Sequence, residues 1–495
     1  MEWLANINDA INGLVWGPPA LILIVGTGIF ITFGVKFIQV GKFGHMWGST
    51  IMTLFKKGKD ATAKESDGIN VTPFQAVCTA LASTVGVGNI AGVAGAIAIG
   101  GPGAIFWMWV SAFFGMATKY SEIVLALKYR QVEKDGAYHG GPMYYIEQGI
   151  GGKGQEWKGF AKVLAVVFAI FGGLACFGIG NATQAGEISV AVNNLTGSNF
   201  DSSLITGIIL ALIVGAVIIG GIKRIGTVTS YLVPFMSIFY IICGSIIILM
   251  NITQVPAALL YIVQQAFSLR AVGSGVFGYA IMVAMRRGIA RGVFSNEAGL
   301  GSAPIAHAAS STKDPVKQGL WGIFEVFVDT IIICTITGLV VVLSLRVSGQ
   351  FADGAYVGKL VNGEIVKLSG GALTASAFGD IFTGGDYIVR LALLLFALST
   401  ILGWSYYGER CWGYLSNNNK AVNLCFRIVF VALAFVGAVS SSSHVLTDTS
   451  ALELAWDIAD TLNGLMAIPN LIGLIVLSGV TFSLTKKYFQ TGSSL

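Results

Sequence analysis

Long apolar runs recur along the whole 495-residue chain and constrain its fold more than any other feature. A helix needs about 20 such residues to cross a bilayer. A further run, 255–268, is too short to span, and we expect a re-entrant or interfacial segment there. We expect eleven transmembrane helices, at 17–36, 72–100, 102–127, 160–190, 204–221, 227–250, 270–306, 319–345, 387–410, 424–440 and 454–483.

The composition supports an all-α polytopic membrane protein. Only 11% of the residues are charged and 54% are hydrophobic, whereas about 25% of an average soluble domain is charged. The apolar runs are continuous, which excludes the alternating pattern of porin strands. The cysteines form no CxxC pair and the histidines show no metal-ligand spacing, so we expect no resident cofactor. The net charge of +5 does not indicate nucleic-acid binding, because the positions of the basic residues matter more than their number, and we expect no nucleic-acid partner. No catalytic cluster of His, Asp and Glu is evident, so we do not expect an enzyme.

The basic residues indicate the orientation in the membrane. Most of the 30 Lys and Arg residues fall in alternate loops on one side, and such an excess marks the cytoplasmic side. This predicts a multi-pass cell-membrane protein with its N-terminus outside and its C-terminus in the cytoplasm. The assignment counts Arg286, Arg287 and Arg291 as cytoplasmic.

Two of the expected spans contain poor helical sequence at membrane depth. Thr84-Val85-Gly86-Val87-Gly88-Asn89 lies in the middle of 72–100, and 286–292 carries arginines and glycines inside 270–306. Two interrupted helices in corresponding positions indicate the substrate site of a secondary transporter. Freed N–H groups at the start of a half-helix suit a carboxylate, and freed carbonyl groups suit Na⁺.

The first of these motifs has other interpretations. Residues 86–91 match a dinucleotide-binding fingerprint, but that fingerprint requires a strand before it and a βαβ unit, which a membrane span cannot supply. Gly88 and Gly92 also form a GxxxG pattern that is typical of close helix packing. The motif is therefore compatible with two interpretations, close helix packing and a broken-helix substrate site.

Other polar residues within spans have both a structural and a functional interpretation. Asn181 and Gln184 lie three residues apart, on one helix face with Phe177. Their carboxamides suit either hydrogen bonds between helices or an amino-acid ligand. Ser399 and Thr400, close to Trp404, suit either bonds to the preceding helical turn or oxygen ligands of a hard cation.

Several acidic residues lie in or near the spans, and such residues are functional candidates by default. Lys119 and Glu122 are expected to form a structural ion pair, as are Arg291 and Glu297. No single acid stands out as a proton carrier. The group comprises Glu122, Glu187, Glu297, Glu325, Asp329, Asp457 and Asp460.

The chain resembles the sodium:alanine symporter family, also called the alanine/glycine:cation symporter family, over nearly its whole length. The motifs that carry the resemblance are GVGNIAG at 86–92, GPGAIFW at 101–107, GGPMYY at 140–145, RGVFSNEAGLGSAP at 291–304 and GWSYYGE at 403–409.

The resemblance implies a leucine-transporter-type core of two inverted five-helix repeats, preceded by one extra helix. The corresponding segments are the extra helix and loop at 1–71, the repeats at 72–250 and 251–483, and a tail at 484–495. It also implies Na⁺-driven import of alanine and glycine by alternating access. A proton-coupled amino-acid carrier of the same architecture is the alternative. The preference between the two amino acids and the oligomeric state stay open.

The resemblance further implies roles for individual residues. The N–H groups of Val87 and Gly88 are expected to bind the substrate carboxylate, and Gly288 to contribute from the second break. The substrate pocket is expected to be shaped by Phe177, Asn181, Gln184 and Trp404. Na⁺ is expected at the carbonyls of Ala82 and Val85 with the hydroxyls of Ser399 and Thr400, and a second ion at Thr84 and Asn89.

Overall fold

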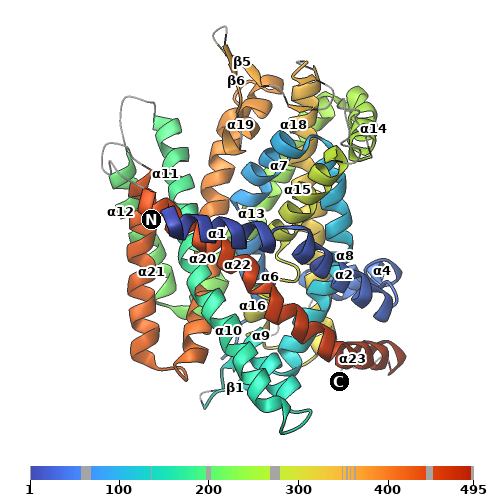
Figure 1. The fold of residues 1–495 in the computed structure, drawn as a ribbon, viewed down its shortest axis with the longest axis vertical. Coiled ribbons are helices and arrows are strands. Elements are labelled where there is room, and N and C mark those ends of the chain that lie inside the picture. Colours follow the sequence, from blue (N-terminus) through green and yellow to red (C-terminus); the bar gives the residue numbers. More distant parts are fainter. Residues whose placement is uncertain are drawn as a thin grey trace.

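The structure is a computed structural model in which long helices run side by side (Figure 1). Strands β5 (Lys359–Val361) and β6 (Glu364–Val366) lie at its upper edge as drawn, whereas β1 (Gln131–Val132) and the C-terminus lie toward its lower edge. The predicted all-α architecture is confirmed. The described residues are 2–56, 69–134, 136–196, 202–267, 279–347, 349–352, 355–356, 358–361, 364–368, 370–441 and 450–491.

The first part of the chain contains the extra helix and the first set of spans. The N-terminal elements are α1 (Glu2–Val15), α2 (Pro18–Gly34), α3 (Ile38–Gly41), α4 (Phe43–Ser49) and α5 (Ile51–Leu54). They are followed by α6 (Pro73–Thr84), η3 (Gly88–Gly92), α7 (Val93–Gly100), α8 (Gly103–Lys128), α9 (Pro142–Tyr145), η4 (Ile146–Ile150), α10 (Trp157–Phe177), η5 (Gly178–Ala182), α11 (Thr183–Thr196), α12 (Ser203–Ile218) and α13 (Gly221–Met250).

The second part begins with a short helix after Asn251 and continues to the C-terminus. Its helices are η6 (Ile252–Gln254), α14 (Val255–Ala266), α15 (Tyr279–Asn296), α16 (Ala303–Ala308), α17 (Pro315–Val326), η7 (Phe327–Cys334), α18 (Thr335–Val347), α19 (Gly370–Ile381), α20 (Gly385–Leu415), α21 (Lys420–Ser440), α22 (Ser450–Leu465) and α23 (Ala467–Thr491).

Three antiparallel hairpins connect helices at the ends of the bundle. β1 (Gln131–Val132) pairs with β2 (Tyr138–His139) after α8. The other two lie between α18 and α19, and their strands are β3 (Phe351–Ala352) with β4 (Ala355–Tyr356), and β5 (Lys359–Val361) with β6 (Glu364–Val366).

Fewer helices than the expected eleven meet the criteria of length and apolarity for a membrane span. Within the described residues, eight helices are long and apolar enough to cross a membrane, or nine if the bent pair Pro73–Thr84 and Gly88–Gly100 is one span. Two predicted spans appear as shorter helices, namely α12 and the pair α15 and α16. The count of eleven is therefore not confirmed, whereas the expected short helix at 255–268 is present as α14.

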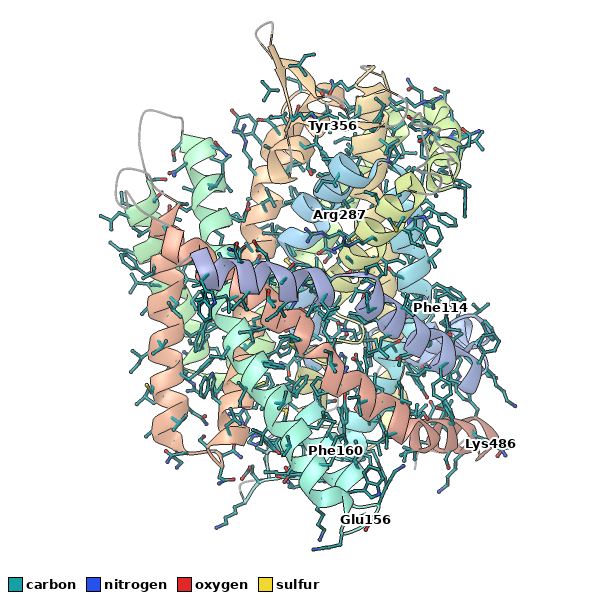
Figure 2. All side chains as sticks on the ribbon, in the orientation of Figure 1. Phe114, Glu156, Phe160, Arg287, Tyr356 and Lys486 are labelled. Atoms are coloured by element: carbon teal, nitrogen blue, oxygen red, sulfur yellow. The ribbon has the colours of Figure 1, made fainter. Side chains whose placement is uncertain are left out.

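Helix α8 lies in the interior, where it packs against α15 and α17. Its most apolar window is 83% buried, whereas that of α13 is 33% buried. Polar and charged side chains are tolerated on α8 because they face other helices and not lipid. The surface of α13 instead carries exposed apolar side chains such as Phe235 and Leu249, and Figure 2 shows side chains of this kind around the outside of the molecule.

The second break lies further along the chain than expected. Helix α15 continues without interruption through 286–292, so the prediction of a break there is wrong. The chain leaves the helix at Glu297, and Glu297, Gly299 and Gly301 have φ angles of 55°, 94° and 85°. These left-handed conformations are the positions that favour glycine, and α16 begins only at Ala303.

The glycines of 286–292 have a packing role instead. A Cβ atom at Gly288 would lie 2.2 Å from the carbonyl oxygen of Ala104, and one at Gly292 would lie 2.2 Å from the Ser111 hydroxyl. Both positions therefore allow α15 to approach α8 closely. Gly288 is part of this helix contact and not of a break.

Candidate functional site

The first break lies where it was expected. Helix α6 ends at Thr84, Val85 has non-helical angles (φ −78°, ψ 85°), and η3 begins at Gly88. The two halves of the span differ in direction by 49°. The Asn89 side chain stabilises the turn, because its Oδ1 accepts a 2.9 Å hydrogen bond from the Gly86 N–H group.

The end of α6 faces two hydroxyl groups of α20. The Ser399 Oγ lies 3.2 Å from the Ala82 carbonyl oxygen and 3.5 Å from that of Val85. The Thr400 hydroxyl, which donates to Phe396, is close enough to Gly86 that a Cβ atom there would lie 2.5 Å from it. The structure thus brings together the four residues expected at the first of the two Na⁺ sites, and the carboxyl-terminal end of a helix favours a cation.

A small cavity of about 30 Å³ lies next to these oxygen atoms. Both breaks contribute to it, since Gly86, Val87 and Gly88 come from the first, and Ser295 and Glu297 come from the second. Six of the predicted site residues line it, namely Thr84, Val87, Gly88, Gln184, Thr400 and Trp404.

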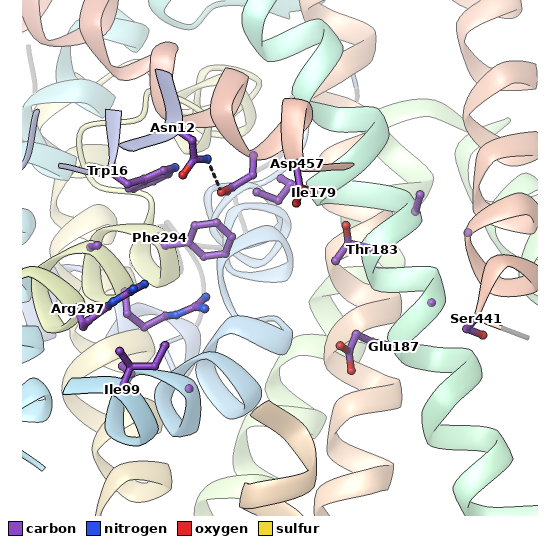
Figure 3. A pocket seen from close by; sticks show the side chains of 18 of the residues that line it. Asn12, Trp16, Ile99, Ile179, Thr183, Glu187, Arg287, Phe294, Ser441 and Asp457 are labelled. Carbon is purple, nitrogen blue, oxygen red and sulfur yellow. Dashed lines mark hydrogen bonds between the residues drawn. The ribbon is translucent and has the colours of Figure 1, made fainter. Parts of the chain in front are cut away.

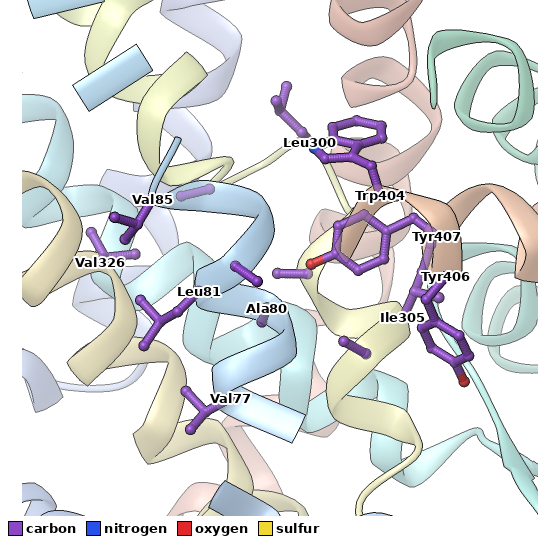
Figure 4. Close-up of a cluster of buried hydrophobic side chains, with 14 of the residues drawn as sticks. Val77, Ala80, Leu81, Val85, Leu300, Ile305, Val326, Trp404, Tyr406 and Tyr407 are labelled. Atoms are coloured by element: carbon purple, nitrogen blue, oxygen red, sulfur yellow. The ribbon is translucent and has the colours of Figure 1, made fainter. Parts of the chain in front are cut away.

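Gln184 and Trp404 give the cavity its polar and apolar walls. The Gln184 amide group donates a 3.0 Å hydrogen bond to Ile179, and its Oε1 is buried without a partner. Trp404 packs against Tyr407 with ring centroids 5.6 Å apart, and Figure 4 shows both rings across from the end of α6 at Val85. A Cβ atom at Gly180 would lie 2.3 Å from the Trp404 side chain, so the indole ring is tightly held.

Three predicted substrate residues lie away from this cavity. The Asn181 amide donates a 2.7 Å hydrogen bond to Phe430 of α21, and Phe177 packs against Phe426 and Phe430. Their expected face with Gln184 assumed 3.6 residues per turn, but the π-helical segment η5, which begins after Phe177 and contains Asn181, changes this spacing. Gly288, the third, packs against α8 as described above.

The intramembrane acids also have partners other than those expected from the sequence. Lys119 pairs with Glu325 (3.4 Å) and not with Glu122, which accepts hydrogen bonds from Gly299 and Asn470. Glu297 accepts a hydrogen bond from Ser302 and lines the small cavity, so it does not pair with Arg291. Glu122 and Asn470 together stabilise the second break, because Glu122 accepts a hydrogen bond from the Gly299 N–H group and the Asn470 amide donates one to the Gly299 carbonyl.

A larger cavity of about 640 Å³ lies on the other side of Phe294 and Ile179, which line both cavities. Figure 3 shows Arg287 and Glu187 on opposite sides of it. Arg291 lines it as well, with its guanidinium 4.8 Å from the Phe294 ring. Arg287 and Arg291 were counted with the loops, but both belong to α15 and face this cavity.

Comparison with known proteins decides the family. The model of the sodium:alanine symporter family matches residues 1–494. The chain belongs to the sodium:alanine symporter family. It is accordingly a multi-pass membrane protein from a family of Na⁺-coupled amino-acid transporters, and transport, not catalysis, is the activity of its family.

Individual relatives in the sodium:alanine symporter family match over almost their full length. The "Sodium/alanine symporter AgcS" of Methanococcus maripaludis is 48% identical over 99% of this chain and 98% of its own. The "Putative sodium/proton-dependent alanine carrier protein YrbD" of Bacillus subtilis is 35% identical, over 98% and 92%. The crystal structure of MhsT in complex with L-phenylalanine is similar in fold, with a TM-score of 0.53 at 12% identity over 84% of this chain and 97% of that one.

Seven of the residues that line the small cavity were not among the predicted site residues, and they include Ser295, Glu297 and Asn463. A signal for the first two was present. The run after Asn296 contains Gly299 and Gly301 within five residues of a buried acid, a pattern typical of an interrupted span. Asn463 had no comparable signal, since it lies in α22 among ordinary helical residues.

Proposed function

We propose that this protein imports small neutral amino acids, alanine and glycine, together with Na⁺ by alternating access. One observation carries the proposal: the Ser399 hydroxyl faces the Ala82 and Val85 carbonyl oxygens at the end of a broken helix. Na⁺ at this position joins α6 to α20 and thereby holds the first break in shape. Family membership gives the coupling ion and the substrate class independent support.

The substrate carboxylate binds the N–H groups of Val87 and Gly88 in this proposal. These groups precede the half-helix formed by η3 and α7, where partial positive charge favours an anion. The Gln184 Oε1, which is buried without a partner, accepts a hydrogen bond from the ammonium group. Trp404 limits the side chain to a small size, in keeping with a cavity of about 30 Å³.

The two cavities give the direction of access. The larger cavity is lined by residues near the ends of α7 and α21, such as Ile99 and Ser440, and we assign this end to the outside. Phe294 and Ile179 then separate the outer cavity from the substrate. Rocking of α6–α8 and α15–α18 against the other helices alternately exposes the site, with the N-terminus outside and the C-terminus in the cytoplasm.

Uptake by the purified protein in proteoliposomes tests the proposal. We expect labelled alanine to accumulate when a Na⁺ gradient is imposed, to be displaced by glycine, and to respond to an inside-negative potential. Li⁺ and a proton gradient alone serve as the two comparison conditions. Undiminished uptake with a proton gradient in the absence of Na⁺ would establish the proton-coupled alternative and overturn Na⁺ symport.

A further inference from the structure

Arg291 is a cationic side chain of the outer cavity that forms no ion pair within the part of the chain that the structure describes. Its guanidinium also forms no hydrogen bond to any of those residues. Asp460 of α22 is the acid whose charge acts on it most, but an oxygen of Asp460 accepts a 3.2 Å hydrogen bond from Asn12 instead. The N–H donors of this arginine are therefore available to a ligand in the cavity.

The guanidinium of Arg291 lies against the half-helix that follows the first break. A Cβ atom at Gly92 would lie 2.5 Å from the Arg291 Cζ, and one at Gly88 would lie 4.0 Å from its Nη1. The missing side chain at Gly92 therefore provides the space that the guanidinium occupies. The same half-helix supplies Gly88, whose N–H group is a proposed ligand of the substrate carboxylate. Arg291 thus lies beside that carboxylate position, on the side of the outer cavity.

The aromatic ring of Phe294 contacts both positions. Its ring centroid lies 4.8 Å from the Arg291 guanidinium carbon, and a Cβ atom at Gly88 would lie 3.7 Å from its Cδ1. The ring lines the outer cavity and the small cavity alike. A shift of this one side chain would therefore connect the guanidinium to the N–H group of Gly88.

The charges of the outer cavity suit a zwitterion. Arg287 and Arg291 lie one helical turn apart on α15 and both line the cavity, and Figure 3 shows Glu187 of α11 on the opposite side from Arg287. The arginines attract the carboxylate of an entering amino acid, and the acidic side attracts its ammonium group. A guanidinium binds a carboxylate through two parallel hydrogen bonds. With about 640 Å³ against about 30 Å³ for the small cavity, the outer cavity can hold an amino acid before the Phe294 ring moves.

We propose that Arg291 binds the carboxylate of the incoming amino acid in the outer cavity and passes it to the N–H groups of Val87 and Gly88 when Phe294 moves. The inference rests on the proposed function and deepens it, because it names the first group of the protein that the substrate contacts. It also makes Arg291 a specificity-determining residue, since a compound without a carboxylate group gains nothing from the guanidinium.

The rate of alanine binding to the purified protein tests the proposal without requiring transport. We expect the association rate constant, followed by stopped-flow tryptophan fluorescence at constant Na⁺, to fall about ten-fold or more in Arg291→Gln. Arg291→Lys, which keeps the charge but not the two parallel donors, should give an intermediate rate. Arg286→Gln is the matched control, because Arg286 lies on the exposed side of α15 and bonds the Trp16 carbonyl. Its rate constant should equal that of the unmodified protein, and an equal rate constant in Arg291→Gln overturns the proposal.

Ionic strength separates an electrostatic role of Arg291 from a structural one. Choline chloride added at constant Na⁺ should slow alanine binding to the unmodified protein several-fold, because salt screens the attraction, and should have little effect on Arg291→Gln. The same salt dependence in both proteins would make the role of Arg291 structural and overturn the proposal.

Gly92→Ala provides a second variant that keeps the arginine. Its methyl group would displace the guanidinium, so we expect slower alanine binding, whereas Gly95→Ala adds a methyl group in open space on the same half-helix and should bind at the normal rate. If Arg291→Gln does not fold, this pair decides, and equal rates in the two variants overturn the proposal. Alanine uptake that needs no Na⁺ would defeat the proposed symport but leave these comparisons of binding rate intact.

Discussion

At the scale of single residues, replacement of Ser399 tests the proposed coupling-ion site most directly. Replacement of Ser399 by Ala removes one oxygen ligand but leaves the Ala82 and Val85 carbonyls in place. Loss of a contact to a charged group costs about 1.5–3 kcal/mol. We therefore expect the Na⁺ concentration for half-maximal alanine uptake to rise about ten-fold or more.

Ser405 provides the control for that measurement. Its buried hydroxyl, also on α20, donates to the Leu402 carbonyl within its own helix and does not line either cavity. Ser405→Ala should keep the Na⁺ dependence of the unmodified protein. An unchanged Na⁺ dependence in Ser399→Ala would remove this hydroxyl from the ion site.

In the proposed site, Trp404 lines the cavity and limits the size of the side chain that fits. Leucine at this position removes the indole ring that packs against Tyr407 and Gly180. We expect leucine to compete with labelled alanine for uptake by Trp404→Leu, and not to compete for uptake by the unmodified protein. Trp412→Leu, a change in the same helix at a ring that bonds Gly173, should leave this selectivity unaltered. Continued exclusion of leucine by Trp404→Leu would contradict the assigned role.

At the scale of elements, the first break depends on the absence of a side chain at Gly86. A Cβ atom there would lie 2.5 Å from the Thr400 hydroxyl, so α6 and α20 would have to separate. We expect Gly86→Ala to abolish most Na⁺-driven uptake while the protein still elutes as a single species. Gly26→Ala places a methyl group in open space in α2 and should transport normally. Full uptake by Gly86→Ala would show that the close approach is not required.

The two breaks differ in how well the sequence predicts them. The first has a polar pair and two glycines at membrane depth, and these features coincide with the end of α6. For the second, glycines 288 and 292 suggested a break, but they serve contact with α8. Glycine alone does not distinguish close packing from a turn, because both require the missing Cβ atom. The positive φ angles at Gly299 and Gly301 separate the two cases.

Local periodicity likewise explains the errors at Phe177 and Asn181. Their predicted face assumed a regular helix, whereas η5 inserts a π-helical segment at Gly178–Ala182. Phe177 directly precedes this segment and Asn181 lies within it, so neither shares the face of Gln184. Nothing in the sequence of an apolar span marks such a segment clearly. Gln184, which follows the segment, still reaches the cavity.

For the whole molecule, hydropathy predicts the membrane spans well. The distribution of charge is a poorer guide to which segments are loops. Nearly every predicted span corresponds to a helix, because backbone groups in lipid must bond within their own segment. Arg287 and Arg291 were counted with the loops, but they lie in α15 and face the larger cavity, where charged side chains are tolerated because they do not face lipid. The excess of basic residues in the remaining loops still predicts a cytoplasmic C-terminus.

Labelling of cysteines placed at the two ends of α21 tests this orientation. In a Cys425→Ser background, which removes an exposed native thiol, Ser441→Cys lies at the outer cavity and Lys420→Cys at the opposite end of the helix. We expect a membrane-impermeant maleimide to label Ser441→Cys on intact cells, and Lys420→Cys only after permeabilisation. The reverse pattern would place the N-terminus in the cytoplasm.

The central claim is that peptide groups freed at the first break hold the amino acid and its coupling ion. An experimental structure with alanine and Na⁺ bound measures this most directly. The account predicts the alanine carboxylate at the N–H groups of Val87 and Gly88, and Na⁺ between the Ala82 and Val85 carbonyls and the Ser399 hydroxyl. Alanine bound solely by side chains in the outer cavity, with no ion beside Ser399, would contradict it.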